Sequence, residues 1–221
     1  MKNMIKLVII DFDDTLSLTE EAFFKIENCI AKKMGYPPMK RAAHQKNWGK
    51  PVKKAISERI PGINPDKFME MHKKILPSFV KDGKVDVVSD KNIKTLKTLK
   101  NNGKHLVILT SRTFHEVEHL LDKNHHLNKW IEKIYHADNS KYLKPDPKVF
   151  NQSFTDFNVK PQETVYIGDS ISDGVSAKEA GIHFIALLES GLRAKKDFKS
   201  IHVDFFANAF PEIIKYILCV D

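Results

Sequence analysis

The sequence predicts an α/β fold, a doubly wound, Rossmann-like parallel sheet with a small α-helical domain inserted into it. Residues 5–10 form an apolar run, rich in Val and Ile and without polar alternation, which is typical of a strand buried on both faces of a parallel sheet. From Asp90 onward, helical and strand patterns alternate, which implies right-handed crossovers between parallel strands. Residues 17–88 show helical patterns and no strong strand pattern. We therefore expect a core domain of residues 1–16 and 89–221, with residues 17–88 as an inserted helical domain.

Composition sets limits on the class of protein. A chain of 221 residues that is 42% hydrophobic can bury a proper core, and its longest early apolar run, Leu7 to Ile10, is too short to span a membrane. Two cysteines give no disulfide framework, so a reduced, cytoplasmic protein is expected. The net charge of +8 comes mostly from scattered lysines, which favours anionic small substrates over a nucleic-acid partner. The sequence does not distinguish a monomer from a dimer.

The inserted segment is expected to hold three helices. Thr19 can cap the first and Gly35 can end it, and the apolar residues between them recur at helical spacing. Tyr36-Pro37-Pro38 then forces an extended break. The helices are expected at residues 20–34, 50–60 and 65–80.

The second half of the chain is expected to alternate helices with strands. Gly103 and Gly181 each follow a helical pattern and precede a strand pattern. The expected strands are residues 105–109, 131–135, 164–167 and 183–188. The expected helices are residues 90–102, from 113 to about 123, 145–158, from 172 or 173 to 181, and 210–218.

Polar groups follow several of these elements at what should be one edge of the sheet, because the carboxyl ends of parallel strands meet there. They are Asp11 and Asp13 after the first strand, Thr110 and Ser111 after the second, Lys144 before Pro145, and Asp169 and Asp173 after a later strand. Each has an ordinary alternative as a turn residue, a helix cap or a surface lysine, but these alternatives do not explain the shared edge. Together the groups can attack a substrate, shuttle a proton, hold phosphate oxygens and bind a metal ion.

These motifs resemble those of the haloacid dehalogenase (HAD) superfamily, particularly its phosphoglycolate-phosphatase-like members. The resemblance covers residues 4 to 190, and its motifs occur in the order found in the family. The helical insert falls where the family inserts a C1-type cap. Asp14 stands where many members have glycine. The motifs are Asp11-Phe12-Asp13-Asp14-Thr15-Leu16, Leu109-Thr110-Ser111, Lys144-Pro145-Asp146-Pro147 and Gly168-Asp169-Ser170-Ile171-Ser172-Asp173.

The resemblance implies a phosphatase that hydrolyses a small phosphorylated metabolite. Asp11 would form an aspartyl-phosphate, and Asp13 would protonate the leaving oxygen and then deprotonate water. Asp11, the backbone carbonyl of Asp13 and Asp169 would coordinate Mg²⁺, with Asp173 supporting the site directly or from outside the set of ligands. The phosphoryl oxygens would be bound by Thr110, Ser111 and Lys144.

Other functions remain open at this point. A phosphomutase or another phosphotransferase would use the same aspartyl-phosphate, and a phospho-accepting receiver module also has Asp, Thr and Lys at a sheet edge. Asp13 and the metal carboxylates argue against a dehalogenase, and the intact set of catalytic groups argues against a purely binding protein. Within the cap, the candidates for substrate specificity are Arg41, His44, Lys46, Trp48 and Lys50, with ordinary solvated surface as the alternative for each.

Overall fold

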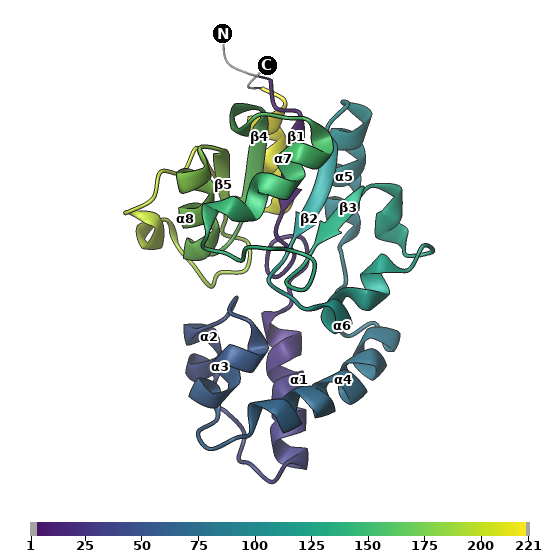
Figure 1. Cartoon of the computed structure of the whole chain (residues 1–221), viewed down its shortest axis with the longest axis vertical. Helices are drawn as coiled ribbons and strands as arrows, with labels where there is room; N and C mark the ends of the chain where they lie inside the picture. The colour runs from purple at the N-terminus through teal and green to yellow at the C-terminus, as the bar shows by residue number, and fades with distance from the viewer. Residues whose placement is uncertain (1–3, 220–221) are drawn as a thin grey trace.

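The computed structural model describes residues 4–219 and contains a six-stranded, all-parallel sheet with strand order β3-β2-β1-β4-β5-β6. Helices cover both faces of the sheet, and a separate group of helices lies at one end of it (Figure 1). The predicted fold class is confirmed. The strands are β1 (Leu7–Ile10), β2 (His105–Leu109), β3 (Lys133–Tyr135), β4 (Thr164–Gly168), β5 (His183–Leu187) and β6 (Phe205–Ala207).

The central strand, β1, determines which residues meet at the sheet edge. All four of its residues are buried, and in the register Ile10 lies beside Ile108 of β2 and Ile167 of β4. The three neighbouring strands β2, β1 and β4 therefore end at nearly the same level. The residues that follow, including Asp11, Thr110 and Asp169, emerge together at the carboxyl edge.

Two apolar layers flank the sheet, one on each face. Leu96 of α5 and Ile213 of α9 belong to the first, and Phe150 and Ala177 belong to the second. This two-sided burial is why β1 lacks polar alternation. The core helices are α5 (Asp90–Asn101), α6 (Phe114–Val117), α7 (Asn151–Phe157), α8 (Ile171–Ala180) and α9 (Ile213–Ile217).

Four helices in the inserted segment pack on one another around their own apolar cluster and lie below the core in Figure 1. The cluster includes Phe23, Ile56 and Phe68, all buried. A buried ion pair, with 2.5 Å between Arg59 Nη1 and Glu27 Oε1, ties α3 to α1. The helices are α1 (Glu20–Lys33), α2 (Arg41–Lys46), α3 (Val52–Arg59) and α4 (Pro65–Lys81), and we refer to them with their loops as the cap.

Several expected elements differ from the observed ones. The expected helix from residue 145 was wrong at its start, because the Asp146 side chain caps a 3₁₀ turn at Pro147–Phe150 before α7 begins. The expected helix to residue 123 ends early, since α6 gives way to a 3₁₀ turn. Two elements were missed. The helix α2 lacks apolar periodicity, and β6 is a three-residue edge strand.

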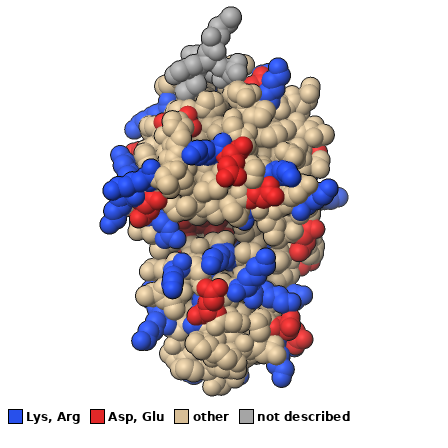
Figure 2. Space-filling view, turned by 60° about the vertical axis from the view of Figure 1, so that its left-hand side comes forward, with Lys and Arg blue, Asp and Glu red and all other residues tan. Residues whose placement is uncertain are grey.

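Charged side chains are spread over both units on the face drawn in Figure 2, with Lys and Arg in no single stripe. This distribution agrees with the interpretation of the lysines as solvated surface. Within residues 4–219, none of the helices is both long enough and apolar enough to cross a membrane.

Candidate active site

Lys144 joins two of the carboxylates at the sheet edge. Its Nζ lies 3.0 Å from Asp11 Oδ1 and 2.8 Å from Asp173 Oδ1, and it also donates a hydrogen bond to the Tyr166 hydroxyl at 3.0 Å. Burial opposes the charge on Lys144, but the two carboxylates more than offset it and hold the pKa of the ammonium above its usual range. Lys144 is therefore a fixed cation in contact with Asp11, the residue that follows β1.

Three buried carboxylates, those of Asp11, Asp169 and Asp173, converge so closely that one oxygen of each lies within 4.8 Å of the others. Burial raises the pKa of Asp11 to about 8, with Asp173 and Asp13 adding to the rise and Lys144 opposing it. Burial and the neighbouring carboxylates also hold the pKa of Asp169 well above its usual range. Such a set of oxygen ligands fits a hard divalent cation, whose charge would offset the repulsion among the carboxylates.

Asp173 has both oxygens occupied by protein groups. Oδ1 accepts from Lys144 and from Tyr166, and Oδ2 accepts from the backbone N–H and the hydroxyl of Ser170. A Cβ on Gly168 would lie 2.6 Å from this side chain, so glycine at the end of β4 permits its close approach. These contacts favour Asp173 as the group that positions Lys144, with Asp11 and Asp169 facing a cation more freely.

The loop after β2 supplies the hydroxyls. Thr110 is buried, and its backbone N–H donates to Tyr135 O at 2.9 Å. Its Oγ1 accepts from the backbone N–H of Arg112 at 3.2 Å. Ser111 lines the pocket that also contains Asp11, Lys144 and Asp169. The four predicted groups thus meet at one edge.

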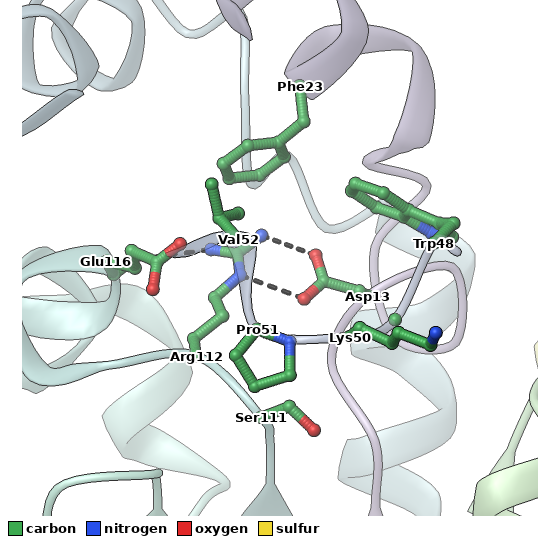
Figure 3. A pocket seen from close by; sticks show the side chains of 10 residues that line it. Asp13, Phe23, Trp48, Lys50, Pro51, Val52, Ser111, Arg112 and Glu116 are labelled. Carbon is green, nitrogen blue, oxygen red and sulfur yellow. Dashed lines mark hydrogen bonds and ion pairs between the residues drawn. The ribbon is translucent and has the colours of Figure 1, made fainter. Parts of the chain in front are cut away.

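Asp13 lies two residues beyond Asp11, and its carboxylate is held by a guanidinium. Arg112 donates from Nη2 to Asp13 Oδ1 at 2.6 Å and from Nε to Oδ2 at 3.0 Å (Figure 3). The Thr19 hydroxyl donates to Asp13 Oδ1 at 2.5 Å. With its side chain engaged in this way, Asp13 still lines the pocket between core and cap.

Arg112 in turn connects Asp13 to residues 82–89, the segment through which the chain returns from the cap to the core. Its Nη1 and Nη2 donate to the two oxygens of Asp86, both at 2.7 Å. The guanidinium carbon lies 4.8 Å from the ring centre of Phe12 in the core and 4.7 Å from that of Phe23 in the cap. Arg112 therefore contacts Phe12 and Asp13 in the loop after β1 and Asp86 between α4 and α5. It also contacts Phe23 of α1 in the cap.

Comparison with known proteins identifies the family. Residues 8–187 match the model of the haloacid dehalogenase-like hydrolases, well over half of the chain. The chain belongs to this family. The prediction from sequence of the HAD superfamily, and of an enzyme that is a hydrolase, is confirmed.

Named relatives of this HAD hydrolase are phosphatases. It is 23% identical over 219 residues to a phosphoglycolate phosphatase of Nitrosospira multiformis, a match that covers 96% of each chain. It is 26% identical over 200 residues to a phosphorylated carbohydrates phosphatase of Thermotoga maritima, covering 85% of this chain and 92% of the relative.

Solved structures share the fold. A predicted phosphoglycolate phosphatase from Haemophilus somnus superposes with a TM-score of 0.82 at 18% identity, covering 96% of this chain and 97% of the other. A mutant CbbY from Rhodobacter sphaeroides in complex with xylulose 1,5-bisphosphate superposes with a TM-score of 0.79 at 19% identity, covering 95% and 96%. At these identities, the likeness extends to the fold alone.

The cap of this HAD hydrolase reaches the site through Trp48. The indole Nε1 donates to Asp14 Oδ2 at 2.5 Å, and Trp48 lines both pockets at the sheet edge. Asp14 has φ 52°, a left-handed conformation that explains why glycine is common at this position. Burial, with a contribution from Asp13, raises the pKa of Asp14 to about 6. The aspartate thus adds a cap contact that glycine cannot make.

Three further cap candidates for specificity, Lys50, Arg41 and His44, lie in different places. Lys50 lines the pocket beside Asp13 and Arg112. Arg41 forms an ion pair with Glu20 and stacks on Phe24, while His44 is buried and its Nδ1 lies 2.8 Å from Glu20 Oε1. Neither residue lines the pocket, because Arg41 is held at the exposed surface of the cap by Glu20 and His44 is buried within the cap.

Sequence reasoning missed two arginines at the site. Arg193, in the loop after β5, lines the pocket with Lys144 and Asp169. Arg112 was passed over although it directly follows Ser111 and is one of only four arginines in the chain. An arginine that directly follows a motif, in a chain with so few arginines, was the sequence signal that could have identified Arg112 as a site residue.

Proposed function

We propose that this HAD hydrolase is a Mg²⁺-dependent phosphatase that hydrolyses small phosphorylated metabolites through an aspartyl-phosphate. The observation that supports it most directly is the buried Asp11 carboxylate, 3.0 Å from Lys144 Nζ and clustered with Asp169 and Asp173. A nucleophile, a fixed cation for phosphoryl oxygens and a ligand set for a hard metal ion are what phosphoryl transfer requires.

In the first step, an oxygen of Asp11 attacks the phosphorus of the ester. The bond from this oxygen to phosphorus forms while the bond to the ester oxygen breaks, and Asp13 gives its proton to the departing alcohol. Lys144, Thr110 and Ser111 neutralise and orient the phosphoryl oxygens, whose charge is stabilised best in a site that excludes bulk water.

In the second step, water attacks the phosphorus of the aspartyl-phosphate. Asp13, now ionised, takes a proton from the water, the bond between phosphorus and Asp11 breaks, and inorganic phosphate leaves. Both carboxylates return to their starting states. Asp13 lines the pocket between core and cap, which supports this double role. The proton transfers require the Asp13 side chain to leave Arg112 and turn toward the ester oxygen, since both of its oxygens accept from the guanidinium in the arrangement described.

The metal ion would be held by Asp11, the backbone carbonyl of Asp13 and Asp169, with Asp173 in support. When bound, Mg²⁺ would neutralise charge on the phosphoryl group and keep the Asp11 carboxylate ionised. The rise in the pKa of Asp11 to about 8 supports the need for such a cation, because a protonated Asp11 would not attack.

The substrate is a small phosphate ester. The relatives named as phosphatases of phosphoglycolate and of phosphorylated carbohydrates support this class. We further propose residues 17–88 as a lid, since Trp48 and Lys50 of the cap line the pockets at the sheet edge. Closure would exclude water and strengthen the charge interactions within.

The test is turnover of p-nitrophenyl phosphate and of a panel of phosphorylated metabolites with Mg²⁺ or with chelator. Asp11→Asn should abolish phosphate release, whereas Asp82→Asn, which alters an exposed ion pair with Lys84, should keep it. Far-UV circular dichroism checks that both variants fold. Phosphate release by folded Asp11→Asn, or full activity after chelation, would contradict the proposal. Phosphate found on a second substrate hydroxyl would instead identify a phosphotransferase.

A further inference from the structure

A second cluster of potential metal ligands lies where the cap meets the core. It consists of His72 from α4 of the cap and of His115 and Glu116 from α6 of the core, with one ligand atom of each within 4.8 Å of the others. None of the three takes part in the proposed phosphoryl transfer. Figure 3 shows Glu116 beside Arg112 at the edge of the pocket.

The two imidazoles face each other through nitrogen atoms. His72 Nδ1 lies 3.3 Å from His115 Nε2. Zinc bound tetrahedrally to two imidazoles at about 2.0–2.1 Å holds their nitrogens roughly 3.3–3.4 Å apart, so the observed separation already matches that of a shared ion. A carboxylate oxygen of Glu116 would complete the set.

Hydrogen bonds behind His115 fix the tautomer that a metal ligand needs. The Thr113 hydroxyl donates to Glu116 Oε2 at 2.6 Å, so the 2.9 Å contact of Thr113 Oγ1 with His115 Nδ1 is made by the ring N–H. Nε2 of His115 therefore presents a lone pair toward His72. A histidine that binds a metal through one nitrogen while donating the other N–H to an oxygen is the usual arrangement in metal sites.

His72 is the buried member of the pair. Its side chain is fully buried, and within the described part of the chain its Nε2 has no hydrogen-bond partner. The nearby guanidinium of Arg112 is matched by the carboxylates of Asp13 and Asp86, and so does not leave an uncompensated positive charge beside the site.

We propose that His72, His115 and Glu116 form a transition-metal site of the zinc class that clamps the cap to the core. Two imidazoles and one carboxylate suit Zn²⁺ or Co²⁺ and not Mg²⁺, which prefers oxygen ligands alone. Because the ligands come from both units, the ion binds the closed arrangement better and shifts the population toward it. Micromolar zinc would then slow release of product without competing for the carboxylates of the active site.

The binding test uses Co²⁺ with the protein saturated by Mg²⁺. The parent should bind one equivalent of Co²⁺ with the intense visible bands of a tetrahedral site, and His115→Ala should bind it at least tenfold more weakly. His202→Ala, which removes an exposed imidazole outside the cluster, is the matched control and should bind like the parent. Glu116→Gln is the second variant, since the amide oxygen still accepts from Thr113.

Equal binding of Co²⁺ by the parent and by folded His115→Ala, or a spectrum of octahedral oxygen ligands alone, would overturn the proposal and leave the contact as a hydrogen bond. The clamp predicts that Zn²⁺ lowers the parent's kcat at saturating Mg²⁺ and leaves that of His115→Ala unchanged; equal inhibition of both would overturn the clamp. Only this second readout rests on the proposed phosphatase function, so a protein without turnover would still report the metal site through its Co²⁺ spectrum.

Discussion

Replacement of Asp86 by asparagine tests how strongly the segment between α4 and α5 is tied to Arg112 in the loop after β2. The Asp86 side chain is 2% exposed, accepts two hydrogen bonds of 2.7 Å from Arg112, and lies 2.8 Å from His119 Nε2. Removing one partner of a buried ion pair costs about 3–5 kcal/mol. Arg112 keeps Asp13 as a second partner, so we expect the lower end, a loss of about 3 kcal/mol. Asparagine tolerates the observed φ of 61°, so the change tests charge and not backbone strain.

The loss should depend on pH in a defined direction. Burial alone would raise the pKa of Asp86, but Arg112 more than offsets it and holds this pKa below its usual value of 3.8. The carboxylate therefore stabilises the fold fully above the pKa that it has in the unfolded chain, and this stabilisation is lost as pH falls through the lower folded pKa. The difference between parent and Asp86→Asn should be complete at pH 7 and shrink below about pH 4.

Urea unfolding followed by tryptophan fluorescence measures the effect. Asp82→Asn is the matched control, because Asp82 pairs with Lys84 in solvent and its loss should change the free energy of unfolding by less than about 0.5 kcal/mol. A folded Asp86→Asn protein whose stability at pH 7 equals that of the control would refute the reasoning about the buried pair.

Two further predictions concern turnover. Lys144→Met should lower kcat by about 10²–10³, as expected for the loss of a donor to the phosphoryl oxygens, and a kcat within threefold of the parent's would argue that another cation serves. Lys50→Ala should change the ratio of kcat/KM for metabolites to that for p-nitrophenyl phosphate, because Lys50 lines the pocket. Arg41→Ala should leave that ratio unchanged, because Arg41 is held by Glu20. Identical ratios across the panel for all three proteins would remove Lys50 from specificity.

The groups at the sheet edge could be predicted because they depend on strand topology alone. Asp11, Thr110 and Asp169 each follow a parallel strand, and adjacent parallel strands in register bring their ends together whatever the rest of the chain does. The apolar run of β1 and the breaks at Gly103 and Gly181 are local signals, and they located the elements well.

The contacts around Arg112 could not be predicted in this way. Arg112 is 99 residues from Asp13 and 26 from Asp86, so their pairing depends on how the segment between α4 and α5 packs against the loop after β2. The contact of Asp14 with Trp48 depends likewise on the docking of the cap. Neither pairing leaves a periodic trace in the sequence, unlike a helix face or a buried strand.

The central claim is that Asp11 carries the phosphoryl group between substrate and water. Rapid acid quenching of the enzyme with ³²P-labelled p-nitrophenyl phosphate and Mg²⁺ measures this directly. We predict protein-bound label that hydroxylamine removes, as for an acyl phosphate, located on the peptide containing Asp11 and absent from Asp11→Asn. Turnover without protein-bound label, or label on any other residue, would contradict the account.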